Sequence, residues 1–370
     1  MARLGDICEI LDSKRVPITA TERQPGPYPY YGANGVQDYV ADYIFDDDLV
    51  LLAEDGGNFG SKDKPIAYRV SGKCWVNNHA HVLKPKEGLN VDYLCYSLMF
   101  YDVTGLFNGA TRQKLTQADM RKMEIPLPSL DEQRKIAAVL DKVSDLIAKR
   151  RQQLDKLDEL IKARFVEMFG DCKQNPKNWS VWDLEDIAQV GSSKRVFVEE
   201  LKESGIPFYR GTEVGALAEG KKIEPELFIT EKHYDELCQV TGRPQIGDLL
   251  MPSICPDGRI WVVDSEKPFY FKDGRVLWVH DINKNVNSTF LLYTLKNRIM
   301  ADYSSIASGT TFAELKIFSL KKCKIFNVPT ELQNQFAAFV EQTEKTKTTI
   351  SKSLEKLETL KKALMQEYFG

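Results

Sequence analysis

The chain has 370 residues, of which 43% are hydrophobic and 28% charged, a composition typical of a soluble globular protein of two or more domains. It lacks a run of about 18 apolar residues, and its N-terminus, MARLGDICEI, lacks the apolar core of a secretory signal, so we expect neither a membrane span nor export. The net charge of −3 speaks mildly against DNA binding by this chain alone, although local basic patches or a partner could supply phosphate contacts.

The seven cysteines are scattered and none is spaced as CxxC. They are Cys8, Cys74, Cys95, Cys172, Cys238, Cys255 and Cys323. This odd number without a pattern predicts reduced thiols in a cytoplasmic protein, and it disfavours a disulfide framework or a zinc site.

The first 128 residues predict a globule of mixed structure. Short β-rich runs such as DLVLLAE (48–54) and PIAYRV (65–70) are interrupted by Gly, Pro and Asn, and a short helix is expected at 91–100. We therefore expect an α/β (α+β) domain of roughly 130–160 residues, which is enough to bury a core.

Residues 129–170 predict one long helix. No Gly or Pro occurs between Asp131 and Gly170, where the helix is expected to stop. Apolar residues recur there at a/d heptad positions, namely Ile136, Leu140, Val143, Ile147, Leu154, Leu157 and Ile161. The pattern predicts a coiled-coil helix roughly 60 Å long.

The second half of the chain repeats the first, as a globule at 171–328 and a helix at 329–370. LGDICEILDSKR (4–15) returns as LEDIAQVGSSKR (184–195), YPYYG (28–32) as IPFYRG (206–211), DDLVLL (47–52) as GDLLMP (247–252), and GATRQKL (109–115) as GTTFAEL (309–315). About 20 extra residues lie between Gly211 and Gly247. Two copies of one scaffold that differ in a single stretch suggest two related binding sites that recognise different targets.

The second long helix keeps the same register. Its expected packing positions are Phe336, Val340, Ile350, Leu354, Leu357 and Leu364. Because one globule separates the two helices in the chain, the simplest pairing is antiparallel, with a globule at each end and a pseudo-twofold relation between the copies. Dimeric DNA-binding proteins use this geometry for half-sites.

Four features together resemble one known family. They are the L-G-D-I opening at 4–7, the proline and helix start PSLDEQ (128–133) with its copy VPTELQ (328–333), the G-x-T motifs at 109–111 and 309–311, and NPKNW (175–179). On these motifs the chain resembles the specificity (S) subunits of type I restriction–modification systems, over nearly its whole length. Leu332 departs from the pattern, because the family usually has Glu there.

The resemblance implies a division of labour. Each globule would be a target recognition domain for one half of a split sequence in double-stranded DNA, and the coiled coil would set the gap between the halves. Two methyltransferase (M) subunits would dock on this chain and transfer methyl from S-adenosylmethionine to adenine, and restriction (R) subunits with ATP and Mg would join them. The S subunit itself would catalyse nothing and bind no cofactor.

The residues give little support to an enzyme. A methyltransferase would need a glycine-rich cofactor loop and an NPP[FY] or DPP[YF] motif, and neither is present. We interpret EDGGNFGS (54–61) as a turn, with phosphate binding as the lesser alternative. His79 and His81 are expected on one side of a strand, and a structural role is favoured over a metal site because further ligands are lacking.

Candidate DNA contacts are hydroxyls, amides and cations in loops that recur in the repeat. In the first copy they are Lys14, Arg15, Tyr30, Tyr31, Asn34, Arg112, Gln113 and Lys114. In the second copy they are Lys194, Arg195, Tyr209, Arg210, Thr212, Lys221 and Lys222.

Each kind of candidate has an alternative. The Lys-Arg pairs could be solvated loops and the aromatics could pack the core. AKRRQQ (148–153) is expected to be a solvated helix face, with M-subunit or DNA contact as the minority reading. The alternative function is a coiled-coil scaffold with duplicated ligand-binding globules that touches no nucleic acid.

Overall fold

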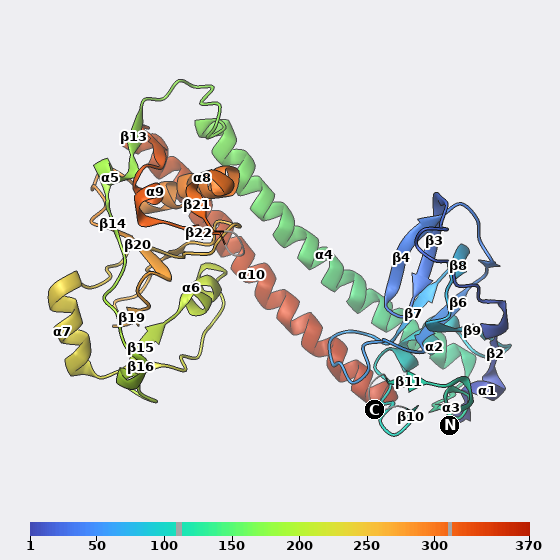
Figure 1. Ribbon diagram of the computed structural model, residues 1–370. Helices are drawn as coiled ribbons and strands as arrows, with labels where there is room; N and C mark the ends of the chain where they lie inside the picture. Colours follow the sequence, from blue (N-terminus) through green and yellow to red (C-terminus); the bar gives the residue numbers. More distant parts are fainter. Residues whose placement is uncertain (109–112, 310–312) are drawn as a thin grey trace. The chain divides into compact units, whose positions relative to one another are not determined.

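The structure is a computed structural model that describes residues 1–108, 113–309 and 313–370 (Figure 1). It contains two compact units, unit 1 with Met1–Gln152 and Ser351–Gly370, and unit 2 with Gln153–Ile350. Each unit therefore holds one globule and half of each long helix, whereas the sequence was divided into four successive segments. Among the described residues, no helix combines the length and apolar character that crossing a membrane requires.

Unit 1 contains many short elements and parts of two long helices. Its strands are β1 (Ala2–Arg3), β2 (Cys8–Ile10), β3 (Pro25–Gly32), β4 (Gly35–Val40), β5 (Phe45–Asp46), β6 (Leu49–Ala53), β7 (Ala67–Val70), β8 (Lys73–Val76), β9 (Ala80–Pro85), β10 (Phe107–Asn108), β11 (Lys114–Leu115) and β12 (Glu124–Ile125). Its helices are α1 (Leu4–Ile7), the 3-10 helix η1 (Asp12–Lys14), α2 (Val91–Met99), α3 (Gln117–Met120), and the adjoining parts of α4 (Leu130–Phe169) and α10 (Thr330–Phe369). The helix expected at 91–100 is confirmed.

The centre of unit 1 is an antiparallel sheet in the order β2-β9-β6-β7. Every residue of β6 is buried, because its LVLLA run is apolar on both faces and has neighbours on both. A second sheet, in the order β4-β3-β8-β5, contains one parallel pair, β3 with β8. Mixed sheets with short helices confirm the α/β (α+β) prediction.

Unit 2 is built from the corresponding elements with one replaced segment. Its strands are β13 (Val181–Asp183), β14 (Gln189–Gly191), β15 (Ile206–Tyr209), β16 (Phe228–Ile229), β17 (Leu249–Pro252), β18 (Trp261–Val262), β19 (Tyr270–Phe271), β20 (Val276–His280), β21 (Ala307–Ser308), β22 (Glu314–Leu315) and β23 (Lys324–Phe326). Its helices are α5 (Leu184–Ile187), the 3-10 helix η2 (Val198–Glu200), α6 (Gly211–Ala218), α7 (Glu231–Thr241), α8 (Ser288–Ile306), α9 (Ile317–Lys321) and the remaining parts of α4 and α10.

The sheet topology repeats between the units. The order β14-β20-β17-β18 matches β2-β9-β6-β7, and the parallel pair β15–β19 matches β3–β8. Between β3 and β6 unit 1 has β4 and β5, whereas between β15 and β17 unit 2 has α6, β16 and α7. β16 pairs antiparallel with β15 as β4 does with β3, so the two helices are the added part. The prediction that one internal stretch differs between Gly211 and Gly247 is confirmed.

The alignment of the two copies predicted from the sequence is wrong by one residue at the central strands, β6 and β17. The LGDI motif aligns Ile10 with Val190, and these residues pair with Leu83 and Val279. Leu83 and Val279 in turn pair with Val50 and Leu249 on the central strands. The ladders thus align Val50 with Leu249, whereas DDLVLL and GDLLMP align it with Leu250. Two apolar runs resemble each other in either register, so the correct register is known only from the hydrogen-bonded pairing of the strands.

The long helices confirm the predicted spans, at Leu130–Phe169 and Thr330–Phe369. Within each unit they lie side by side and antiparallel (Figure 1). In unit 2, Asp158 pairs with Lys347 at 2.7 Å while the rings of Phe165 and Phe336 are 5.5 Å apart. In unit 1, Arg151 pairs with Glu358 at 2.7 Å. The residue after α4, Gly170, has a φ of +89°, which suits glycine at a helix end.

The predicted packing positions fall into two groups. Ile136, Leu140, Val143, Ile147, Ile161, Phe336 and Val340 are buried. Leu154, Leu157, Ile350, Leu354, Leu357 and Leu364 are half-buried.

The heptad pattern missed two aromatic residues that dominate the unit 2 end of α4. Phe165 and Phe169 are fully buried, and their ring centroids are 5.0 Å apart. Phe169 also lies 4.9 Å from Phe290 and 5.4 Å from Phe336, so four rings form one cluster. Their energy comes from apolar burial and edge-to-face geometry.

Candidate nucleic-acid interface

Three predicted contact residues of unit 1 meet at the end of β6, although they come from different parts of the sequence. Glu54 accepts from Arg15 Nη1 at 2.6 Å and from Lys114 Nζ at 2.9 Å. Asn34 Nδ2 donates to the carbonyl of Gly56 at 3.0 Å. The loops that carry the candidates are therefore assembled around residues 54–56.

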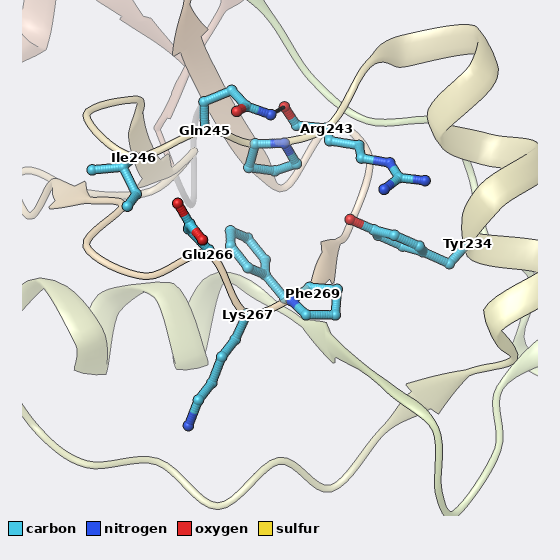
Figure 2. A pocket seen from close by; sticks show the side chains of 9 residues that line it. Tyr234, Arg243, Gln245, Ile246, Glu266, Lys267 and Phe269 are labelled. Carbon is cyan, nitrogen blue, oxygen red and sulfur yellow. Dashed lines mark hydrogen bonds between the residues drawn. The ribbon is translucent and has the colours of Figure 1, made fainter.

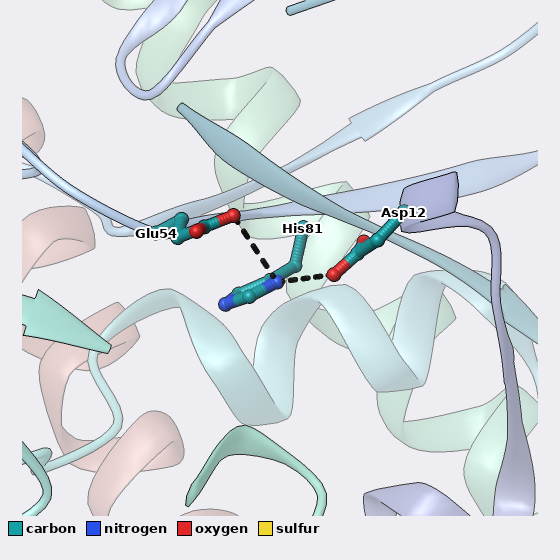
Figure 3. Close-up of side chains that lie close together, drawn as sticks. All are labelled: Asp12, Glu54 and His81. Carbon is teal, nitrogen blue, oxygen red and sulfur yellow. Dashed lines mark hydrogen bonds and ion pairs between the residues drawn. The ribbon is translucent and has the colours of Figure 1, made fainter. Parts of the chain in front are cut away.

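A buried histidine lies beneath this group (Figure 3). His81 has no exposed surface, and its Nδ1 lies 2.7 Å from Asp12 Oδ2 and 3.7 Å from Glu54 Oε2. Its other nitrogen, Nε2, lies 2.9 Å from the carbonyl oxygen of Leu115. The imidazole thereby links three segments: η1, the residue after β6, and β11.

The two carboxylates are stabilised in their ionised forms. Burial alone would raise the pKa of Asp12, but hydrogen bonds from His81, the Val82 N–H and Gln117 hold it below its ordinary value. For Glu54, burial is likewise outweighed by Arg15 and Lys114, and its pKa is lowered. Both groups therefore carry negative charge in a largely dry site.

The cluster has the residue types of a metal site but the environment of an ion-pair network. Ligand atoms of Asp12, Glu54 and His81 lie within 4.8 Å of one another. Arg15 and Lys114 already bring two positive charges to the same carboxylates, so a divalent cation would meet repulsion there. His79 binds a different carboxylate, with its Nδ1 2.5 Å from Asp55. The structural role expected for the histidines fits this geometry.

Two of the predicted DNA contacts in unit 1 need correction. Tyr30 is only 1% exposed, and its hydroxyl bonds to the backbone of Ile18, so it is a core residue. The side chain of Arg15 is 12% exposed and is held by Glu54 and by the carbonyl of Ala80 at 2.7 Å. Its guanidinium fixes a loop and does not face outward. The sequence of a loop motif does not reveal that its side chains are buried in this way.

The remaining candidates of unit 1 stay predictions. Lys14, Asn34, Gln113 and Lys114 are exposed. Tyr31 is half-buried, with its ring 5.7 Å from that of Tyr68. Arg112 lies outside the described residues.

In unit 2 several candidates gather around α6. Arg210 donates its backbone N–H to Glu213 at 2.8 Å and places Nη2 3.0 Å from Glu226. Thr212 donates to the same Glu213 carboxylate at 3.0 Å. Burial opposes the ionisation of Glu213, but the bonds from Arg210 lower its pKa to about 2. Lys221, just beyond α6, forms an ion pair with Glu219.

The other unit 2 candidates are spread over the surface. Lys194 and Lys222 are exposed, and Arg195 is exposed and pairs with Asp273 at 3.2 Å. The ring of Tyr209 is half-buried and stacks on Phe269 at 5.1 Å, so it contributes mainly to the core. Base contact by Tyr209 would be limited to its exposed part.

Unit 2 also has a cavity of about 450 Å³ between the end of α7 and the 266–269 loop (Figure 2). Its wall includes Tyr234, Arg243, Ile246, Glu266, Lys267 and Phe269. Arg243 pairs with Asp235 at 2.7 Å and lies over the ring of Tyr234. Charges of both signs line the cavity, and none of the predicted contacts that the structure describes does. The lining of the cavity therefore does not indicate a particular class of ligand.

The sequence matches the family described as the type I restriction modification DNA specificity domain, over residues 1–159 and 176–361. The chain belongs to this family. The two matched regions correspond to the two copies of the internal repeat. The chain is thus a specificity subunit of the type I restriction–modification class, whose role is DNA recognition.

Individual relatives agree with the family match. The chain is 31% identical over 356 residues to a putative type I restriction enzyme specificity subunit of Haemophilus influenzae, covering 95% of this chain and 89% of the relative. It is 27% identical over 311 residues to a type I restriction enzyme specificity subunit of Methanocaldococcus jannaschii, covering 75% and 68%.

Solved structures share the fold. The S subunit of a type I restriction–modification system from M. genitalium superposes with a TM-score of 0.60 at 16% identity, over 100% of this chain and 95% of the other. A chain from a structure on complex assembly and conformational transition of the type I system gives 0.56 at 16% identity, over 100% and 96%. At this identity the likeness concerns the fold alone.

The specificity domains contain functional neighbours that the sequence analysis missed. Asp12, Glu54 and Glu213 hold the cations that had been singled out, yet none had been named as a partner of these cations. The cations that they hold lie between 3 residues away, as for Asp12 and Arg15, and 60 residues away, as for Glu54 and Lys114. The available signal was Asp12 itself, two residues before the recurring Lys-Arg pair.

Proposed function

We propose that this specificity subunit reads a bipartite DNA target, with unit 1 reading one half and unit 2 the other, and that it catalyses no reaction itself. The observation that carries the proposal is the repeated sheet topology with one differing segment, β4 and β5 in unit 1 and α6, β16 and α7 in unit 2. One scaffold with two different surfaces suits two half-sites of different sequence.

The contact surface follows from the exposed donors around each replaced segment. In unit 1 these are Lys14, Asn34, Gln113 and Lys114, and in unit 2 they are Lys194, Arg195, Thr212, Lys221 and Lys222, with the half-buried Arg210 beside them. Several of the cations pair with a carboxylate, such as Glu54, Asp273 or Glu213. Such pairing fixes a cation in position, and it also explains how a chain of net charge −3 could present ordered donors to DNA.

The partners in the proposal are two methyltransferase (M) subunits and, through them, restriction (R) subunits. S-adenosylmethionine would then be bound by the M subunits and ATP with Mg by the R subunits, with no cofactor on this chain. The antiparallel α4 and α10 would set the gap and offer the docking surface for the M subunits. A cytoplasmic location is part of the same proposal, because the chromosomal DNA lies there.

The test is single-molecule sequencing with N6-methyladenine detection, on DNA from cells that carry this chain and a cognate M subunit. We expect a split motif with two unlike halves and a fixed gap. A second strain has residues 179–328 replaced by the same region of another specificity subunit, and only one half of the motif should change. A motif that keeps both halves after the replacement would overturn the two-reader proposal.

A further inference from the structure

The end of β17 in unit 2 has the same backbone connections as the end of β6 in unit 1. The N–H of Ser253 donates to the carbonyl of Arg275 at 2.9 Å, and the N–H of Leu315 donates to the carbonyl of Ser253 at 2.7 Å. In unit 1 the same two bonds meet at Glu54, at 2.9 Å to the residue before β9 and at 2.8 Å from β11. The two joints are therefore equivalent, and Arg275 corresponds to His79.

The charge pattern at this joint differs between the units. The first residue of β22 is Glu314, where β11 has Lys114. In unit 2 the repeat thus places a carboxylate where unit 1 has a predicted DNA contact. Glu314 accepts through Oε1 from Arg275 Nη1, and its Oε2 lies 3.1 Å from Lys316 Nζ. The cations of this joint in unit 2 therefore come from positions that the sequence motifs did not indicate.

The turn between β19 and β20 carries Arg275 and also contacts predicted DNA-binding residues of unit 2. Arg195 pairs with Asp273 of this turn at 3.2 Å. The carbonyl of Arg275 lies beside the first residue of α6, Gly211, where an added Cβ would be 3.5 Å away. Thr212, another predicted contact, is the next residue. The turn thus joins β22 to two of the segments that the proposed function directs toward DNA.

The guanidinium of Arg275 is fixed on one side and open on the other. The side chain is 56% exposed, and Nη1 donates to Glu314. Within the part of the chain that the structure describes, Nε and Nη2 donate to no acceptor. These two donors form a fork that matches the O6 and N7 acceptors of guanine in the major groove. Because Glu314 already orients the side chain, less rotational freedom is lost when a base is bound.

The same carboxylate favours a base over a phosphate as the ligand of Arg275. A hydrogen bond from Lys316 lowers the pKa of Glu314, which is therefore negatively charged at neutral pH. A phosphate oxygen beside the guanidinium would be repelled by this charge, whereas the acceptors of guanine are neutral. Lys316 is 52% exposed and remains for the phosphate backbone.

We propose that Arg275 is a specificity-determining residue of unit 2, which donates its Nε–Nη2 edge to a guanine in the half-site that unit 2 reads, while Glu314 holds it in orientation. The inference rests on the proposed reading of one half-site by each unit. It assigns a base contact to a residue outside the repeated motifs. Glu314 touches no DNA and is a positioning residue.

The test uses the complex with the M subunits and the half-site that changes when residues 179–328 are replaced. Methylation rates are compared between the target and duplexes in which each base pair of that half is substituted in turn. We expect a G·C pair whose substitution slows methylation about 10- to 100-fold. In Arg275→Ala this penalty should disappear at that pair and persist at the others. A half-site without a G·C pair, or an Arg275→Ala complex that discriminates every pair as before, overturns the proposal.

A second measurement separates a base contact from a phosphate contact. Arg275→Lys keeps the positive charge but lacks the fork. It should lose most of the discrimination at the same pair, with an unchanged slope of log affinity against log salt. If Arg275→Ala instead weakens binding of all duplexes equally and lowers that slope by about 1, Arg275 contacts a phosphate and the base contact is refuted.

The role of Glu314 is tested by two variants at that position. Glu314→Ala should reduce discrimination at the G·C pair that Arg275 reads. Glu314→Gln keeps an acceptor for Nη1 and should restore most of it. If Glu314→Ala discriminates this pair as the unmodified complex does, Glu314 does not hold Arg275 and that part of the proposal is overturned.

Arg243→Ala is the matched control. Arg243 is 57% exposed and pairs with Asp235 at 2.7 Å in the same unit, so its removal deletes a similar surface ion pair. It should leave every base preference as it was, and a loss equal to that in Arg275→Ala overturns the proposal. A complex that methylates no split motif contradicts the proposed function and this inference with it. A split motif whose unit 2 half is read equally well without Arg275 contradicts the inference alone.

Discussion

The side-chain carbonyl of Gln133 accepts a hydrogen bond from the backbone N–H of Asn90 at 2.8 Å, and Gln333 accepts the same bond from Asn287 at 2.8 Å. Each Asn in turn caps the next helix, α2 or α8, with its own side chain. This relationship explains the repeated helix start after each proline. The glutamine of the long helix is bonded to the cap of a globule helix, so the two are joined at a fixed point.

Gln133→Ala should therefore destabilise unit 1 strongly. The buried amide also donates to the carbonyls of Gly88 at 3.0 Å and Pro128 at 2.9 Å, so its loss removes the partner of three backbone groups. We expect a loss of about 2–4 kcal/mol in free energy of unfolding, measured by chemical denaturation of the full chain. Gln152→Ala, on an exposed turn of α4, is the control and should change stability by less than about 0.5 kcal/mol. Equal effects of the two variants would refute the role of Gln133.

Phe169→Ala should open a cavity in the four-ring cluster. Because Phe169 is fully buried against Phe165, Phe290 and Phe336, we expect a cost of about 3–5 kcal/mol, located in unit 2. Hydrogen exchange would show faster exchange in α8 and in the adjoining part of α10. Val166→Ala, 45% exposed on the same helix, should leave exchange there unchanged. Exchange that rises only in unit 1 would contradict this packing.

Glu213 should make unit 2 sensitive to acid. Its pKa is lowered from 4.5 to about 2 in the folded state, so its contribution to stability is present above pH 4.5 and is lost as pH falls through about 2. Glu213→Gln should flatten the decline of unit 2 stability between these values, followed by near-ultraviolet circular dichroism of the tryptophans. Glu236→Gln, on the exposed side of α7, should leave the decline as it is. If unit 2 stability falls with pH in Glu213→Gln as steeply as in the unmodified chain, the Glu213 carboxylate is not the cause of the acid sensitivity.

Lys114→Gln should weaken binding of target DNA by the assembled complex. The ammonium is half-exposed, and its removal would delete the phosphate contact that the proposed function assigns to it and leave the Glu54 charge less compensated. We expect the slope of log affinity against log salt to fall by about 1, with an affinity loss of about tenfold at low salt. Lys142→Gln, exposed on α4, is the matched change of charge and should leave the slope as it was. Parallel salt dependences for unmodified and Lys114→Gln complexes would place the DNA elsewhere.

Much of the fold can be predicted from the sequence, because the sequence signals for it are local or periodic. Heptads and the lack of Gly and Pro predict α4 to within a residue, and the copied motifs predict the second unit. The heptad rule failed at Phe165 and Phe169, because their burial depends on Phe290 of α8 as well as on Phe336 of the partner helix.

The site was less accessible to sequence reasoning. Lys114 and Arg15 were predicted as cations in recurring loops, but the sequence does not reveal that they share one partner. Here that partner is Glu54, which no spacing connects with either residue. Ion pairs between a sheet residue and a loop residue are set by tertiary structure. A single sequence does not reveal them unless the pairing of its strands is known.

The division of the chain into units has a consequence for its synthesis. Unit 2 is one continuous stretch, Gln153–Ile350, whereas unit 1 needs Ser351–Gly370 together with its first 152 residues. On the ribosome, the first unit to be translated is thus the last that can be completed, because its apolar face around Tyr93 waits for Phe369. A chain stalled before residue 351 would carry a finished second unit and an unfinished first one, which is where a protease or chaperone would find exposed surface.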